Sequence, residues 1–221
     1  TVAPDKTGQG VGKPILACGM ESGTAVFFDV TNGSTRPLSV SAFSLGKDPL
    51  LTLDAIPSST ATPETVSGLP TGNRSNAVLV AGGMAGDAED VSQLRKDQAG
   101  RTVLFKAVCC NENDDKSPDW SFKQRARLST CRVDRESFNG KPGVSVCRFR
   151  PHDGRLLAIG GWDRRIRLFE RSKGKPMAIL KGTTGSVADL DWAADSMESG
   201  LLASASRDEK LISIWQCYAK S

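Results

Sequence analysis

Histidine is almost absent from this 221-residue sequence, which has a single one, His152, and a single tyrosine. Ser-His-Asp and Cys-His sites need a histidine base held beside the nucleophile. Such a site would have to be built on the Pro-His-Asp-Gly turn that contains His152. We therefore expect no catalytic residues and do not expect an enzyme.

Metal and nucleotide motifs are also missing. No Cys-x-x-Cys pair or nearby histidine completes a zinc site, and neither Gly8–Pro14 nor 81–86 has the glycine spacing of a phosphate or dinucleotide loop. The acidic run 111–115 lacks the glycine and closing glutamate of a calcium loop. We expect no cofactor and no metal. Most cysteines lie in strand-like apolar runs, which indicates reduced, buried thiols in a cytoplasmic or nuclear protein, although the adjacent pair Cys109 and Cys110 leaves redox or metal chemistry open; the six are Cys18, Cys109, Cys110, Cys131, Cys147 and Cys217.

No apolar run approaches the roughly 18 to 20 residues of a membrane span, and the first residues, TVAPDKTGQG, do not form a secretion signal. The net charge of +4 is unevenly spread. The net charge is −4 for residues 1–119, +10 for residues 120–175 and −2 for residues 176–221. The basic middle could meet an acidic partner or nucleic acid, but alternation as in Arg165-Ile166-Arg167-Leu168 is typical of solvated strand faces.

The chain instead contains many short runs of β-branched and apolar residues, separated by Gly, Pro, Asn and Asp. About thirteen such runs are present, among them ILACG, AVLVAGG, LLAIGG and LISIW, and no segment has the periodicity of an amphipathic helix. An all-β fold is predicted.

Internal repeats identify the kind of β fold. The segment from Gly143 to Gly182 contains four strand-like runs joined by short turns, and the segment from Ser186 to Tyr218 repeats the first three. Asp163 and Asp208 occupy equivalent turns, at a spacing that fits the roughly 40 to 45 residues of a four-stranded propeller blade. Near the start, ILACGMESGTAVFFD aligns without a gap on the 158–169 region.

We therefore expect a β-propeller segment of about three and a half blades. The predicted units are the second to fourth strands of one blade at about 14–44, a degenerate blade at about 48–130, a blade at 143–182 and a last blade at 186–218. Polar inserts at 58–75 and 84–100 lengthen two turns of the degenerate blade. Because propellers close with more blades than this, we expect the C-terminal portion of a propeller of about seven.

The last blade carries a set of polar residues with a known pattern. Thr183 precedes its first strand, Ser204 lies in the second, Asp208 in the following turn and Trp215 in the third. This order resembles the WD-repeat (WD40) family, with Thr183 where that family has histidine. The stretch LAIGGWDRRIRLF and the ending SIWQCY resemble the G-protein-β-subunit-like, or ASTRA-associated, subfamily. The resemblance implies a buried hydrogen-bonded set of Ser204, Asp208 and Trp215, with Asp163 structural in the preceding blade.

The resemblance also implies function. Such proteins are scaffolds in the co-chaperone assembly that matures phosphatidylinositol-3-kinase-related kinases and in the chromatin-associated ASTRA complex, in cytoplasm and nucleus. Alternatives are a generic WD40 adaptor, such as a ubiquitin-ligase substrate receptor or signalling scaffold, or an RNA- or DNA-binding propeller. We expect protein partners to contact exposed turns on one rim, at Trp162, Arg164, Arg165 and Arg207.

Overall fold

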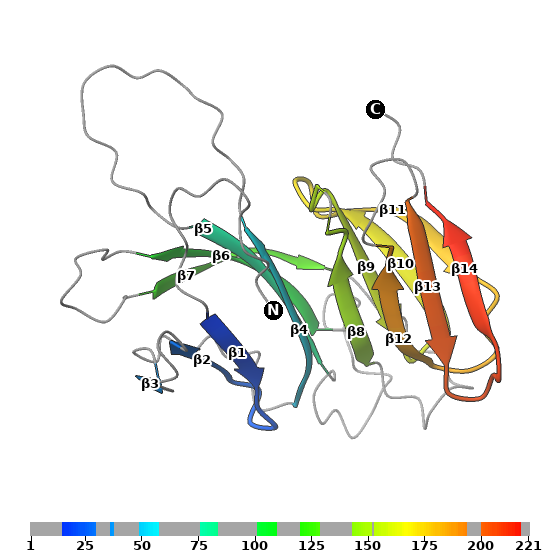
Figure 1. Cartoon of the computed structure of the whole chain (residues 1–221), viewed down its shortest axis with the longest axis horizontal. Helices are drawn as coiled ribbons and strands as arrows, with labels where there is room; N and C mark the ends of the chain where they lie inside the picture. The colour runs from blue at the N-terminus through cyan, green and yellow to red at the C-terminus, as the bar shows by residue number, and fades with distance from the viewer. Residues whose placement is uncertain are drawn as a thin grey trace, which may run out of the picture.

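The computed structural model describes residues 15–29, 36–37, 49–57, 76–83, 101–109, 120–128, 143–151, 153–193 and 200–217. These residues form fourteen strands and no helix, arranged as four antiparallel sheets (Figure 1). The all-β prediction is confirmed. The predicted inserts at 58–75 and 84–100 lie outside the described residues. The described residues contain no helix long and apolar enough to cross a membrane.

Four sheets follow one another along the chain. Sheet 1 has three strands in the order β1-β2-β3 and sheet 2 has four in the order β4-β5-β6-β7. Their bounds are β1 Ile15–Gly19, β2 Ala25–Asp29, β3 Arg36–Pro37, β4 Leu50–Pro57, β5 Asn76–Gly83, β6 Arg101–Cys109 and β7 Trp120–Leu128.

Sheet 3 has four strands, β8 to β11, and sheet 4 has three, β12 to β14, each paired in chain order. Their bounds are β8 Val144–Phe149, β9 Leu156–Gly161, β10 Arg165–Glu170, β11 Lys175–Lys181, β12 Val187–Trp192, β13 Leu201–Ser206 and β14 Ile212–Gln216. Pairing of neighbouring strands in sequence order is the topology of a propeller blade.

The sheets repeat one another in detail. The first strands of sheets 2, 3 and 4 each carry a β-bulge at the same place, after Leu50, Val144 and Val187 respectively. A bulge at an equivalent place in three strands reflects one structural unit used three times. It also fixes which residues of the three strands are equivalent: Asp54 corresponds to Arg148 and to Asp191.

The hairpin of β1 and β2 matches that of β9 and β10. Ala17 pairs with Phe27 as Ala158 pairs with Leu168, in agreement with the gapless alignment of the two sequence segments. Both turns place one residue in the left-handed region, Gly23 at φ 76° and Arg164 at φ 62°. Because a side chain is strained there, the turn shape is retained in sheet 3 at some cost to stability.

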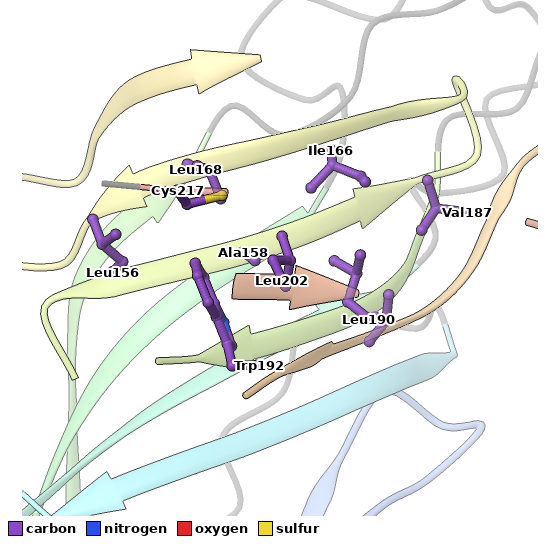
Figure 2. Close-up of a cluster of buried hydrophobic side chains, with 10 residues drawn as sticks. Leu156, Ala158, Ile166, Leu168, Val187, Leu190, Trp192, Leu202 and Cys217 are labelled. Atoms are coloured by element: carbon purple, nitrogen blue, oxygen red, sulfur yellow. The ribbon is translucent and has the colours of Figure 1, made fainter. Parts of the chain in front are cut away.

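Two apolar layers join the sheets. One lies between sheets 2 and 3 and includes Leu104, Phe149 and Phe169, and the other lies between sheets 3 and 4. Figure 2 shows the second layer, in which Ala158, Ile166 and Leu168 of sheet 3 meet side chains of β12 and β13. Sheets 2, 3 and 4 are therefore stacked in chain order, with the first strands β4, β8 and β12 in contact.

Candidate protein-interaction rim

The β9–β10 turn carries most of the predicted rim residues. Its first residue, Trp162, is half-buried, because the indole ring covers Gly143: a Cβ at Gly143 would lie 2.5 Å from Cδ2 of the ring. The backbone amide of Trp162 also donates to the carbonyl oxygen of Gly143, at 2.9 Å. Trp162 is thus fixed against the start of its own blade and presents only part of its ring to solvent.

Asp163 is buried in the same turn and binds Arg167 of β10. Arg167 Nη1 donates to Asp163 Oδ1 at 3.0 Å, and Arg167 Nη2 donates to Oδ2 at 2.5 Å. The interpretation of the 165–168 alternation as a solvated face was wrong for Arg167, whose exposed fraction is only 4%. The two-point contact with a buried carboxylate makes this burial of the guanidinium possible. An Asp in a hairpin turn followed four residues later by Arg is the signal that sequence reasoning missed.

The connection from β11 to β12 links the turns of sheets 3 and 4. The Thr183 hydroxyl donates to the carbonyl oxygen of Arg164 at 2.7 Å, and the backbone amide of Thr184 donates to the carboxylate of Glu209. Glu209 lies in the β13–β14 turn beside Arg207, whose amide donates to the carbonyl of Ser186. The β9–β10 turn and the β13–β14 turn therefore lie on the same side of the stacked sheets. We call this side, with its two turns, the rim.

The predicted hydrogen-bonded set is only partly assembled. Trp215 Nε1 donates to the hydroxyl of the buried Ser204 at 2.8 Å. Asp208, expected to be buried with them, is exposed and lies over Gly185. The Thr183 hydroxyl, which stands where the WD-repeat family has histidine, points to the previous blade. A Thr side chain is too short to span the distance that an imidazole covers.

The rim residues differ in accessibility. Arg207 is exposed, while Trp162, Arg164 and Arg165 are half-buried. Lys181, which pairs with Arg165 across β10 and β11, and Lys210 are also exposed, so the rim of sheets 3 and 4 is predominantly basic. This arrangement favours a partner with acidic groups.

Side chains of β4 make a second set of contacts that the sequence did not predict. The amide of Cys147 donates to Thr52 Oγ1 at 3.0 Å, and the amide of Phe149 donates to Asp54 Oδ2 at 2.7 Å. Burial raises the pKa of Asp54, and the hydrogen bonds that its carboxylate accepts from the amides of Phe149 and Ala55 oppose the rise only in part. The bonds to Cys147 and Phe149 join the first strands of sheets 2 and 3. Alignment of Asp54 with Asp191 in the repeated sequence is the signal that could have shown them.

The remaining candidates for metal or redox chemistry are the cysteines and the single histidine. No group of three metal-ligating side chains is found among the described residues. Cys18, Cys147 and Cys217 are free thiols, and burial raises the pKa of Cys147 and Cys217, which keeps both protonated. His152, Cys110, Cys131 and the Cys109 side chain lie outside the described residues.

Comparison with known proteins finds relatives that match part of the chain. No family model matches the sequence. The chain is 43% identical over 77 residues to mouse guanine nucleotide-binding protein subunit beta-like protein 1, covering 35% of this chain and 22% of that protein. It is 37% identical over 57 residues to ribosome assembly protein 4 of Chaetomium thermophilum, covering 26% of this chain and 11% of that protein.

The aligned segments thus span less than a quarter of each relative. Both relatives are WD-repeat proteins. The antiparallel sheets, their common bulge and the bond between Ser204 and Trp215 agree with this similarity. The chain is therefore similar to WD-repeat proteins, and its fold is that of part of a WD40-type β-propeller.

Proposed function

We propose that this chain is a non-catalytic scaffold that binds other proteins through the rim of its propeller. The observation that carries the proposal is the linkage of the rim turns of sheets 3 and 4 by Thr183 and Thr184. Because these bonds fix one turn relative to the next, the rim presents a rigid surface that spans two blades. Rigid surfaces lose little conformational entropy on binding.

We place this scaffold in the co-chaperone assembly that matures phosphatidylinositol-3-kinase-related kinases and in the ASTRA complex, in nucleus and cytoplasm. The 43% identity to a G-protein-β-like protein supports this choice of subfamily. The segment order noted in the sequence, with LAIGGWDRRIRLF before the ending SIWQCY, supports it as well.

Trp162, Arg164, Arg165 and Arg207 are the proposed contacts. Arg207 offers an exposed side chain, and Trp162 offers the solvent-exposed part of an indole ring that packs on Gly143. An aromatic side chain held rigid beside arginines is a common anchor of protein interfaces. The proposed partner surface combines an apolar pocket with carboxylates.

Affinity purification with mass spectrometry tests the proposal. The protein is compared with an Arg165→Glu, Arg207→Glu variant, which leaves the packing of Trp162 on Gly143 intact. The control is Arg155→Glu, Lys173→Glu, an equal charge change at exposed residues of the turns that precede β9 and β11. We expect the protein and the control variant to recover co-chaperones of kinase maturation. The rim variant should lose them while its melting temperature stays unchanged.

Two other results would count against the proposal. Equal recovery of partners by the rim variant would remove the rim as the contact. Recovery of ubiquitin-ligase or ribonucleoprotein components in place of co-chaperones would leave the scaffold and reject the kinase-maturation role.

A further inference from the structure

Arg164, in the β9–β10 turn of the rim, has an unusual backbone conformation. Its φ is 62°, and among the described residues it is the one non-glycine residue with a positive φ. In the left-handed region the Cβ atom lies too close to the following carbonyl oxygen, which destabilises the folded chain. Strain of this kind persists where the surrounding structure holds a residue in place, and it gathers at functional sites.

The fold does not require this strain, because two equivalent hairpin turns of the chain avoid it. In sheet 1 the turn spans residues 20–24, as many as residues 161–165 in sheet 3, and it places Gly23 in the left-handed region. In sheet 4 the turn spans residues 206–211, one residue more, and none of these described residues has a positive φ. Sheet 3 therefore keeps Arg164 where a glycine or a longer turn would remove the strain.

Contacts on both sides of Arg164 hold it in this conformation. The preceding residue, Asp163, is buried and bonds to Arg167 through both carboxylate oxygens. The carbonyl oxygen of Arg164 accepts the hydroxyl of Thr183, in the β11–β12 connection, at 2.7 Å. Because the backbone of Arg164 is fixed before a partner arrives, binding at this residue loses little conformational entropy.

The residues around Arg164 on the rim are mainly basic. Arg165 follows it and pairs with Lys181 across β10 and β11, and Arg207 lies in the equivalent turn of sheet 4. These cations belong to two successive sheets, so they are spread along the rim. A row of separate carboxylates matches such a spread better than one multiply charged group does. A guanidinium can donate two parallel hydrogen bonds to each carboxylate.

We infer, on the basis of the rim as the proposed binding surface, that Arg164 is its specificity-determining residue and binds a carboxylate in an acidic segment of the partner. The strained backbone is what places a guanidinium, instead of a glycine, at this point of the turn. Arg165, Lys181 and Arg207 bind further carboxylates of the same segment.

Two substitutions at position 164 measure the strain. Arg164→Ala and Arg164→Gly both remove the side chain, but only glycine adopts a φ of 62° without strain. We expect the Gly variant to melt at least about 2 °C above the Ala variant. Gly23→Ala, in the equivalent turn of sheet 1, is the matched control and should lower the melting temperature. A melting temperature of the Gly variant equal to or below that of the Ala variant would overturn the strain at Arg164.

A labelled acidic peptide tests the ligand. The probe is a short fluorescein-labelled peptide of alternating Glu and Gly, and its binding is followed by fluorescence anisotropy at low ionic strength. We expect its dissociation constant to rise about 10-fold in both Arg164→Gly and Arg164→Ala. Arg155→Ala, an exposed arginine at the opposite end of sheet 3, is the matched control and should change it by less than about 2-fold. A peptide of alternating Lys and Gly should not bind.

Unchanged affinity for the Glu peptide in Arg164→Gly would overturn the role of Arg164. An unaltered protein that does not bind this peptide would overturn the acidic ligand. Failure of the proposed function gives a different result. If Arg164 is needed for peptide binding but affinity purification recovers components other than co-chaperones, the role of Arg164 stands and the kinase-maturation role is rejected.

Discussion

At the scale of single residues, the pair of Asp163 and Arg167 is the contact on the rim that is most sensitive to a single substitution. Both side chains are almost fully buried and share two hydrogen bonds. Loss of Asp163 leaves the charge of Arg167 buried without its carboxylate, whereas loss of both side chains does not. The energetic importance of Asp163 therefore depends on the presence of Arg167.

Asp163→Ala is accordingly expected to lower the free energy of unfolding by about 3 to 5 kcal/mol, and Asp163→Ala with Arg167→Met to lower it by much less. Urea unfolding of both variants provides the measurement. Asp208→Ala is the matched control, because Asp208 occupies the equivalent turn but is exposed, and it should change stability by less than about 0.5 kcal/mol. Equal losses in the single and double variants would reject the pair as described.

Residue roles were the part of this protein that the sequence predicted least well. The turn position of Asp163 was evident from the repeat, but its partner was not, because alternation along β10 gave Arg167 the pattern of a solvated residue. Asp208 shares the sequence position of Asp163 but has Lys210 and Leu211 after it and no arginine four residues on. Burial of a charge depends on its partner, and single positions do not show the partner.

At the scale of strands and sheets, the bond of Trp215 to Ser204 fixes β14 to β13. Ser204→Ala removes the acceptor of the indole N–H, and Trp215→Phe removes the donor. Each is expected to destabilise the protein, Ser204→Ala by about 0.5 to 1.5 kcal/mol. A double-mutant cycle by thermal or urea unfolding should give a coupling energy of at least about 0.5 kcal/mol, and strict additivity would contradict the contact.

Asp54 makes the contact between sheets 2 and 3 sensitive to pH. Because burial raises its pKa above the ordinary 3.8, the folded protein binds the proton more tightly than the unfolded chain. The contribution of Asp54 to stability is therefore full below the unfolded pKa and falls as pH rises through the folded pKa. The difference between the urea midpoint of the protein and that of the Asp54→Asn variant should therefore decrease as the pH rises above about 4.

Glu170 is a control for which the pH dependence of stability should have the opposite sign. Hydrogen bonds from Lys173 and Ser172 lower its pKa, so its contribution is present above the unfolded pKa and is lost as pH falls through the folded pKa. The midpoint relative to Glu170→Gln should therefore increase with pH over the acidic range. A difference for Asp54→Asn that is flat or rises with pH would show that desolvation does not dominate at this carboxylate.

At the scale of the whole molecule, the sequence was sufficient for the fold class. Period-two runs between turn residues gave the strands, and the repeat between the 143–182 and 186–218 segments gave their grouping into units of the WD-repeat kind. The bonds between units could not be predicted in this way. Thr52 and Asp54 contact amides 95 residues away, and only the stacking of sheets brings them together.

Sheets 2 and 3 are joined through their first strands by the side chains of Thr52 and Asp54. Residue-resolved amide hydrogen exchange at Cys147 and Phe149 tests this connection most directly. We expect both amides to be protected in the unaltered protein and to exchange at least about 10-fold faster in Thr52→Val with Asp54→Leu, while amides that bond within sheet 3 keep their protection. Rapid exchange at both amides before any substitution, or no change after it, would contradict the account.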